Sequence, residues 1–106
     1  MTTVAVTGEL DMATSPELDW ALRNASAGAS LVVLDLRGLN FMDSTGLHVI
    51  ITANERLRRE GRQMLVVRGP AAIQRVFTVS GVDRALQITD QPPEMAGSEE
   101  SEDAAA

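Results

Sequence analysis

The stretch Phe41-Met42-Asp43-Ser44-Thr45-Gly46-Leu47 decides the fold, because two different hydrophobic patterns meet in it. Shortly before it, Leu31-Val32-Val33-Leu34-Asp35-Leu36 is the most apolar strand-like run in the chain. Such a run is typical of a strand buried on both faces of a parallel sheet. After it, apolar residues at helical spacing predict a helix over about 45–60. A strand therefore leads into a helix, with Ser44 where the helix begins.

The same alternation continues in both directions from this junction. Strands are predicted over 4–8, 31–36, 63–68 and 86–88, with a loop at 37–40. Helices are predicted from Thr14-Ser15-Pro16 to Gly28, over 45–60, and from Gly69-Pro70 to Gly81. This order predicts an α/β domain with a largely parallel sheet and right-handed crossovers.

The composition separates a folded body from an acidic end. The chain has 106 residues and a net charge of −6, but five of its fifteen acids and none of its bases lie in residues 91–106. Residues 1–90 contain the other ten acids and all nine arginines, so this body has a net charge of −1. We therefore predict one domain over 1–90 and a disordered acidic tail over 91–106. Pro92-Pro93 lies at the start of this tail.

Composition also excludes several classes of function. The chain contains no cysteine and no lysine, which excludes disulfides, thiolate zinc sites, a Walker A loop and a Schiff-base enzyme. It has no basic footprint for nucleic acid, no apolar run that would span a membrane and no signal-peptide pattern. We expect a cytoplasmic protein that uses no metal and no cofactor.

Ser44 has two interpretations. At the carboxyl end of a strand, where open α/β sheets place their sites, it would cap the following helix. It would also tolerate a phosphate, because a helix N-terminus favours negative charge. A phosphate adds about −1.5 to −2 charges at pH 7, which would disturb a partner's surface more than the fold.

The neighbours of Ser44 leave similar alternatives open. Asp43 would either cap nearby N–H groups as a loop residue or add negative field to the site. Thr45 is a second hydroxyl and so a second candidate phosphoacceptor. Ser44 is preferred because a residue at the end of the loop projects outward more freely.

Enzyme motifs fail on spacing. The hydrolase pattern Gly-x-Ser-x-Gly lacks its first glycine before Ser44, and the aspartic protease triplet is interrupted in Asp43-Ser44-Thr45-Gly46. His48, the one histidine, has no orienting third group, so we interpret it as solvent-facing. A phosphoaspartate receiver domain would fit the fold class, but it needs a lysine, and this chain has none. Trp20 is interpreted as partial core or surface packing.

Four blocks of sequence are similar to those of a known family. They are Thr7-Gly8-Glu9-Leu10-Asp11, Val33-Leu34-Asp35-Leu36, Phe41-Met42-Asp43-Ser44-Thr45-Gly46-Leu47 and Val76-Phe77-Thr78-Val79-Ser80-Gly81. They follow the family's order and are spread along nearly all of the stretch 4–88. The chain resembles the anti-sigma factor antagonists, which are single STAS domains. The resemblance implies a mostly parallel or mixed sheet of four to five strands with helices packed on it.

The resemblance also implies a phosphorylation switch. In that family the unphosphorylated antagonist binds an anti-sigma factor that is also a serine kinase, and this frees a sigma factor. The kinase then phosphorylates the serine that corresponds to Ser44, with ATP and magnesium that the kinase holds, and a separate phosphatase reverses the step. The implied partner-binding positions are Asp11, Met12, Met42, Asp43, Thr45, Gly46 and Leu47.

The chain departs from the family's pattern at both ends, and an alternative function stays open. The family usually has an additional strand before Thr7, and it often ends in a helix where this chain has Pro92-Pro93 and acids. An exposed edge or face of this kind would favour a weak homodimer. The alternative function is an unphosphorylated STAS scaffold or ligand-binding module, as in transporters or stress-signalling complexes.

Overall fold

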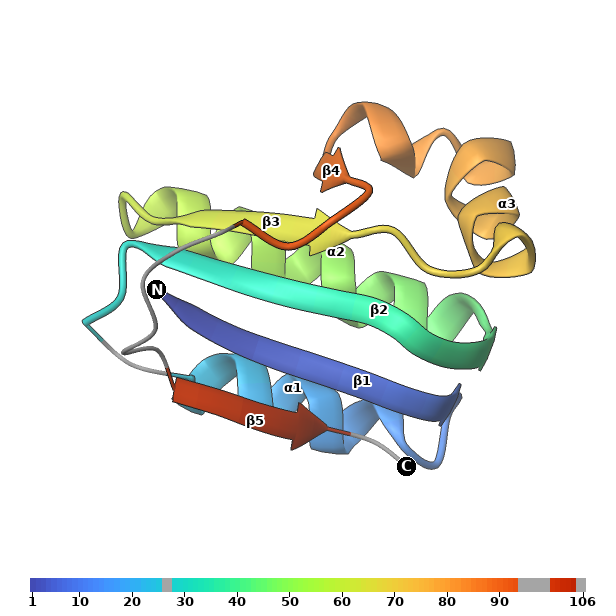
Figure 1. Cartoon of the computed structure of the whole chain (residues 1–106), viewed down its shortest axis with the longest axis horizontal. Coiled ribbons are helices and arrows are strands. Elements are labelled where there is room, and N and C mark those ends of the chain that lie inside the picture. The colour runs from blue at the N-terminus through green and yellow to red at the C-terminus, as the bar shows by residue number, and fades with distance from the viewer. Residues whose placement is uncertain (26–27, 94–99, 105–106) are drawn as a thin grey trace.

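The computed structural model describes residues 1–25, 28–93 and 100–104, in which strands and helices alternate as predicted (Figure 1). The strands are β1 (Thr2–Leu10), β2 (Leu31–Met42), β3 (Gln63–Val67), β4 (Gln87–Thr89) and β5 (Glu100–Ala104). The helices are α1 (Ser15–Asn24), α2 (Ser44–Arg59) and α3 (Ala71–Ser80), and a short 3-10 helix covers Val82–Arg84.

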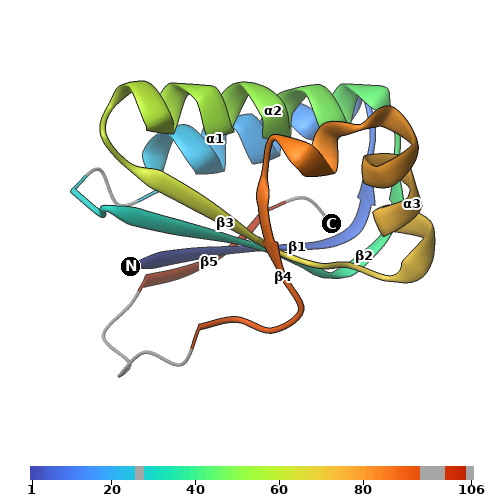
Figure 2. The ribbon, with the colours of Figure 1, turned by 90° about the horizontal axis from the view of Figure 1, so that it is seen from above.

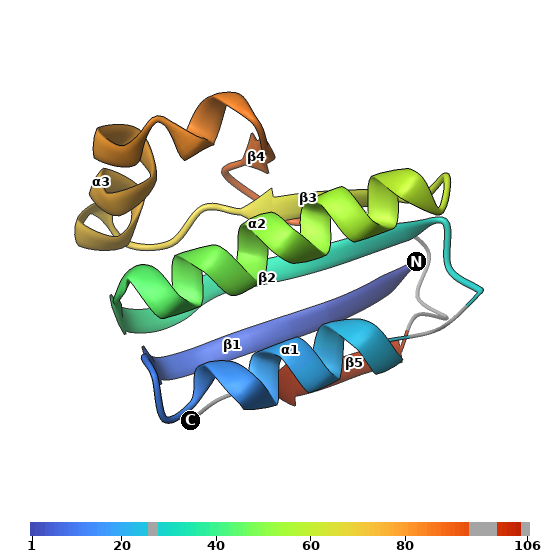
Figure 3. The same ribbon diagram turned by 180° about the vertical axis from the view of Figure 1, so that it is seen from behind.

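All strands belong to one sheet in the order β4-β3-β2-β1-β5, and every neighbouring pair is parallel. The helices α1 and α2 lie side by side on one face of this sheet, as Figures 2 and 3 show from two directions. The helix α3 lies beyond the carboxyl end of β3 (Figure 1). The predicted α/β class with helices packed on a parallel sheet is confirmed.

The central strand β2 is buried on both faces, as its sequence predicts. Val32, Leu34 and Leu36 join the hydrophobic core that α1 and α2 cover. Side chains alternate between faces along a strand, so Val33 points to the opposite face. Val33 is also fully buried. The middle of the sheet is therefore a rigid platform from which the strand ends project.

The predicted loop at 37–40 is wrong, because β2 continues through these residues to Met42. Leu39 is fully buried, and Gly38 pairs with β1 across the ladder. Two register shifts interrupt this ladder, and Gly8 of β1 takes φ 79° there, a conformation that glycine adopts readily. Polar residues and a glycine in a bulged strand break the apolar pattern by which the strand would be recognised.

The first helix begins where the sequence predicts but differs in its details. It starts at Ser15, and it ends at Asn24 rather than near Gly28. Thr14 makes no side-chain bond to the helix. Its hydroxyl donates instead to the Glu9 carbonyl at 2.8 Å, so it ties the end of β1 to the start of α1.

The acidic end of the chain contains a strand. Residues 100–104 form β5, which pairs with β1 in parallel from Thr2↔Glu100 to Val6↔Ala104. This differs from the disordered state expected for that segment, because ladder hydrogen bonds join backbones and need no apolar side chain. Residues 94–99 and 105–106 lie outside the described residues, and the division into a domain over 1–90 and a tail over 91–106 stays a prediction.

Within the residues that the structure describes, none of the helices is both long and apolar enough to cross a membrane.

Candidate functional site

The site forms where β1 and β2 end together. Leu10 pairs with Met42 across the ladder, so the loops that follow the two strands start side by side. The Asp43 amide donates to the Leu10 carbonyl at 3.1 Å, which extends the pairing by one residue. The sheet thus brings together two groups of predicted residues, Asp11 with Met12 and Met42 with its successors, although about thirty positions separate them in the chain.

Asp43 is the residue that caps α2. Its carboxylate accepts hydrogen bonds from the Thr45 amide at 2.9 Å and from the Gly46 amide at 3.1 Å. Ser44 is the first residue of the helix and not its cap, which corrects the capping role considered for it. The sequence left open whether Asp43 caps N–H groups, and the structure confirms that it does.

Hydrogen bonds also set the charge of this carboxylate. The Thr45 hydroxyl, followed by the amides of Gly46, Thr45 and Met12, lowers the pKa of Asp43 below its ordinary value, against the opposing effect of desolvation. The Met12 contribution comes from the neighbouring loop. Asp43 therefore stays ionised at neutral pH and links the two loops of the site.

Asp11 organises the first loop in a similar way. Its carboxylate accepts from the Ala13 amide at 2.9 Å and from the Thr14 amide at 3.1 Å. The Thr14 hydroxyl accepts from the Asp11 amide at 2.9 Å. This compact turn leaves Met12 at its tip with 75% of its surface exposed.

The two candidate phosphoacceptors differ in their surroundings. The Thr45 hydroxyl donates to Asp43 at 2.5 Å and is only partly exposed. Ser44 is exposed, and no hydrogen bond of its hydroxyl occurs within the described part of the chain. The hydroxyl of Ser44 is therefore the more available of the two for chemistry.

The surroundings also change what a phosphate on Ser44 would meet. A helix N-terminus can offer free N–H groups to an anion, but here Asp43 already binds the amides of Thr45 and Gly46. The remaining support is the positive end of the helix dipole. Such a phosphate would stand in solvent beside the Asp43 carboxylate and would concentrate negative charge at the surface.

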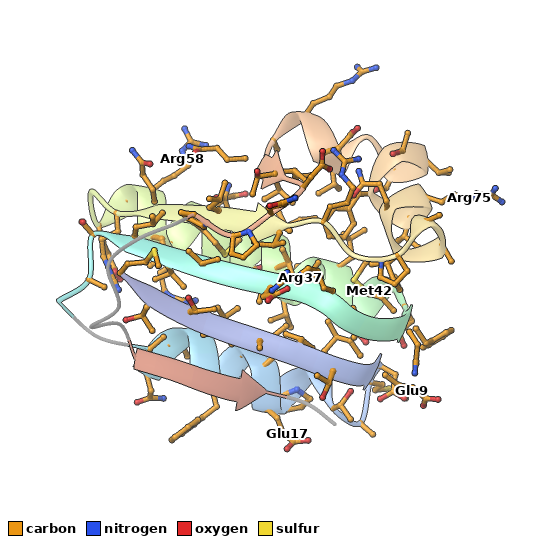
Figure 4. All side chains as sticks on the ribbon, viewed as in Figure 1. Glu9, Glu17, Arg37, Met42, Arg58 and Arg75 are labelled. Atoms are coloured by element: carbon orange, nitrogen blue, oxygen red, sulfur yellow. The ribbon has the colours of Figure 1, made fainter. Side chains whose placement is uncertain are left out.

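A cleft of about 440 Å³ opens beside Ser44, between the start of α2 and the outer side of α3. Most of its wall is apolar side chain, and Figure 4 shows that Arg75 points outward from α3 at this end of the molecule. The residues that line the cleft are Met42, Asp43, Ser44, Leu47, Arg75, Val76, Val79 and Ser80.

Exposed apolar side chains gather at the same end of the sheet. Four large hydrophobic residues are exposed in the described chain. Three of them, Met12, Phe41 and Val79, lie in the first loop, at the end of β2 and on the wall of the cleft. Exposed apolar side chains that gather in one place mark protein–protein contact sites. The fourth, Trp20, lies on α1, so its interpretation as surface packing fits its 64% exposure.

Several predicted site residues form the floor of this surface and not its exposed part. Met42 and Leu47 line the cleft but are only 5% and 8% exposed. Gly46 is buried against β1, where a Cβ atom would lie 2.6 Å from Leu10 Cγ. Gly46 therefore acts by letting α2 approach β1 closely, and it offers no side chain to a partner.

Sequence reasoning missed the contribution of α3 and of Phe41. Arg75, Val79 and Ser80 line the cleft, and Phe41 is 49% exposed, yet none was a candidate site residue. A signal was present in Val79, which is apolar but falls outside the inward stripe of its helix and is 80% exposed.

His48 is the other side chain that was considered as a catalytic group. His48 is exposed on α2, as predicted, and no hydrogen bond of its ring is present among the described residues. Within the same residues, no group of three or more His, Cys, Asp and Glu side chains is placed to hold a metal ion.

Comparisons with known proteins place this geometry in context. The STAS domain family matches residues 1–95. The chain is 30% identical to the "Anti-sigma-B factor antagonist" of Listeria monocytogenes, over 89% of this chain and 83% of that protein. It is 32% identical to the "Anti-sigma F factor antagonist" of Paenibacillus polymyxa, over 82% of this chain and 76% of that protein. The crystal structure of an anti-sigma factor antagonist from Mycobacterium paratuberculosis superposes with a TM-score of 0.73, at 27% identity, over 83% of this chain and 78% of that one.

Proposed function

The chain belongs to the STAS domain family, and from this we propose that it is an anti-sigma factor antagonist whose binding is controlled at Ser44. In this role it binds an anti-sigma factor that is a serine kinase, and a sigma factor is thereby released. Phosphorylation of Ser44 ends the binding. The names of its relatives support the general role, while the kinase and the switch are our inference.

One observation carries this proposal: an exposed hydroxyl without a hydrogen bond among the described residues lies on the wall of a largely apolar cleft. Ser44 and Val79 lie on the wall of the cleft, and Met12 and Phe41 are exposed at the same end of the sheet, where β1 and β2 end. A protein partner that covers this surface would bury Ser44 at or near the centre of the contact. The proposed partner-binding residues are Asp11, Met12, Met42, Asp43, Thr45, Gly46 and Leu47, and we add Phe41 and Val79 because both are exposed at this end of the sheet.

The surroundings of Ser44 support a switch that acts by charge. A phosphate there adds about −1.5 to −2 charges beside the ionised Asp43. An apolar contact that must desolvate this charge becomes costly. The fold has no need of the Ser44 hydroxyl, because Asp43 caps the helix. Modification would therefore change binding and leave folding intact.

In this role the chain acts as a binding protein of the cytoplasm and not as an enzyme. The ATP and magnesium of the switch belong to the kinase, and a separate phosphoserine phosphatase resets Ser44. The chain itself needs no cofactor, membrane or nucleic acid for this role.

The test is to mix the purified protein with candidate anti-sigma kinases and Mg-ATP and to locate added phosphate by mass spectrometry. Phosphate on Ser44, absent from Ser44→Ala and retained in Thr45→Ser, is the expected result. Phosphate on Thr45 would move the site by one residue. Tight binding without phosphate would indicate an unregulated antagonist. Neither binding nor phosphate would favour a STAS scaffold or ligand-binding module.

A further inference from the structure

The outer edge of β1 is a long stretch of backbone that only a short segment covers. The inner edge pairs with β2 from Thr2 to Leu10. On the outer side β5 pairs only from Thr2 to Val6. The rest of β1 has no ladder partner on that side within the described residues.

The strand β1 is itself firmly held. The side chains of Val4, Val6 and Leu10 are fully buried in the core beneath α1 and α2. The edge of β1 therefore keeps its shape whether or not β5 is present. An edge of this kind is a preformed template for another strand.

The segment that occupies this edge is a poor strand by composition. Glu100-Ser101-Glu102-Asp103-Ala104 has three acids and no β-branched or aromatic residue. Residues 1–10 contain no lysine or arginine, so β1 offers no side-chain cation to these acids. A backbone ladder of five residues joins β5 to β1, and β5 also contacts α1.

The position of β5 makes its attachment separable from the rest of the fold. The strands β4 and β5 lie at opposite edges of the sheet, and residues 90–99 connect them (Figure 1). Asp90, the residue after β4, forms a solvent-exposed ion pair with Arg68 at 2.8 Å. The chain can therefore lose β5 without losing any element that builds the core.

We propose that the outer edge of β1 is a strand-binding surface, and that residues 100–104 occupy it and so keep a second copy of the chain from pairing there. Two bare β1 edges are self-complementary about a two-fold axis. Acidic residues on an edge strand oppose edge-to-edge association, because pairing would bring like charges together. The acidic segment thus serves as a removable cover for the edge.

The test compares the full chain with a variant that ends at Pro93, which retains the ion pair between Arg68 and Asp90. Hydrogen exchange is measured at those amides of Thr2–Val6 that point away from β2, and light scattering after gel filtration gives the oligomeric state. We expect exchange about tenfold faster or more in the shortened variant and dimers that increase with concentration, while the full chain stays monomeric.

Two full-length variants separate backbone pairing from charge. Ser101→Pro places inside β5 a residue that strands disfavour and keeps every acid, so it should behave like the shortened variant. Replacing the acids by amides (Glu100→Gln, Glu102→Gln and Asp103→Asn) keeps the ladder, so protection of β1 should persist while association increases.

Two results would overturn the proposal. One is exchange at Thr2–Val6 that neither the shortening nor Ser101→Pro changes, because β5 would then not occupy the edge. The other is a shortened variant that stays monomeric at every concentration, because the bare β1 edge would then not pair with a second copy of the chain. Neither readout involves a kinase, so these results are independent of the proposed function.

Discussion

The Thr45 hydroxyl donates a hydrogen bond to the Asp43 carboxylate at 2.5 Å. The hydroxyl of Ser44, the residue between these two, makes no hydrogen bond within the described residues. Two adjacent hydroxyl groups therefore have different tasks. Thr45 helps to close the helix cap, and Ser44 remains available to an incoming group. This division of roles leads to predictions that the sequence alone would not make.

Ser44→Asp should preserve the fold and weaken partner binding. The new carboxylate lies in the first turn of α2, where the helix dipole favours negative charge. We expect a free energy of unfolding within about 0.5 kcal/mol of the natural chain, measured by urea denaturation. Affinity for the cognate anti-sigma factor, measured by calorimetry, should fall about tenfold or more. Normal affinity would contradict the charge mechanism.

Thr45→Asp should have the opposite profile. Its carboxylate would face the ionised Asp43 carboxylate in place of a donated hydroxyl hydrogen bond. Like charges at this separation destabilise the cap, so the melting temperature should fall by several degrees while Ser44→Asp leaves it nearly unchanged. Equal melting temperatures for these two variants would show that the cap does not distinguish the hydroxyls.

Asp43 should make the stability of the domain depend on pH at the acidic end. Hydrogen bonds lower its pKa in the folded chain, so its contribution is complete above the unfolded value of about 3.9 and is lost as pH falls through the folded pKa. Asp43→Asn keeps a capping oxygen without the titration. The stability difference between the natural chain and this variant should stay constant above about pH 5 and shrink below pH 4. A pH-independent difference would contradict this assignment.

Gly46→Ala should destabilise the domain by about 1–3 kcal/mol, because its Cβ would lie 2.6 Å from Leu10 Cγ in a packed core. Leu10→Ala removes the opposing atoms, so the double variant should cost less than the sum of the two single changes. Gly28→Ala is the matched control, since a Cβ there meets nothing within 4 Å. Simple additivity in urea denaturation would show that Gly46 does not depend on Leu10.

Val79→Arg should weaken partner binding about tenfold or more without unfolding the protein. Val79 is 80% exposed, so the change lies outside the core, and an arginine there would replace apolar wall with a charge at the cleft. Trp20→Arg is the control, because it also removes an exposed hydrophobic residue, at 64% exposure, but from α1. Equal loss of affinity in both variants would contradict the placement of the docking surface.

Hydrophobic periodicity was sufficient to predict the order of the elements and the parallel sheet. The apolar run at 31–36 and the helical spacing after Ser44 depend on burial, which leaves a clear trace in the sequence. Residues 37–40 show no such apolar pattern, because their strand is defined by irregular backbone pairing with β1. For the same reason β5 was not predictable, since its pairing owes nothing to apolar side chains.

The site was predictable in its centre and not at its borders. Local sequence was enough to place Ser44 at the end of a strand and Asp43 beside it. It could not decide which residue caps α2, since that depends on backbone angles at one junction. The sequence did not show that α3 lines the cleft, because residues 42–47 and 75–80 are far apart in the chain and come together only in the folded domain. A surface made from three elements has no local signature.

The pairing of residue 2 with residue 100 has a consequence for how the protein is made. The strand β1 is synthesised well before residues 100–104, which pair with it. Because neighbouring strands are parallel, none of them can form a local hairpin with the next. The nascent chain therefore carries an open β1 edge until residues 100–104 have also been made and can pair with it.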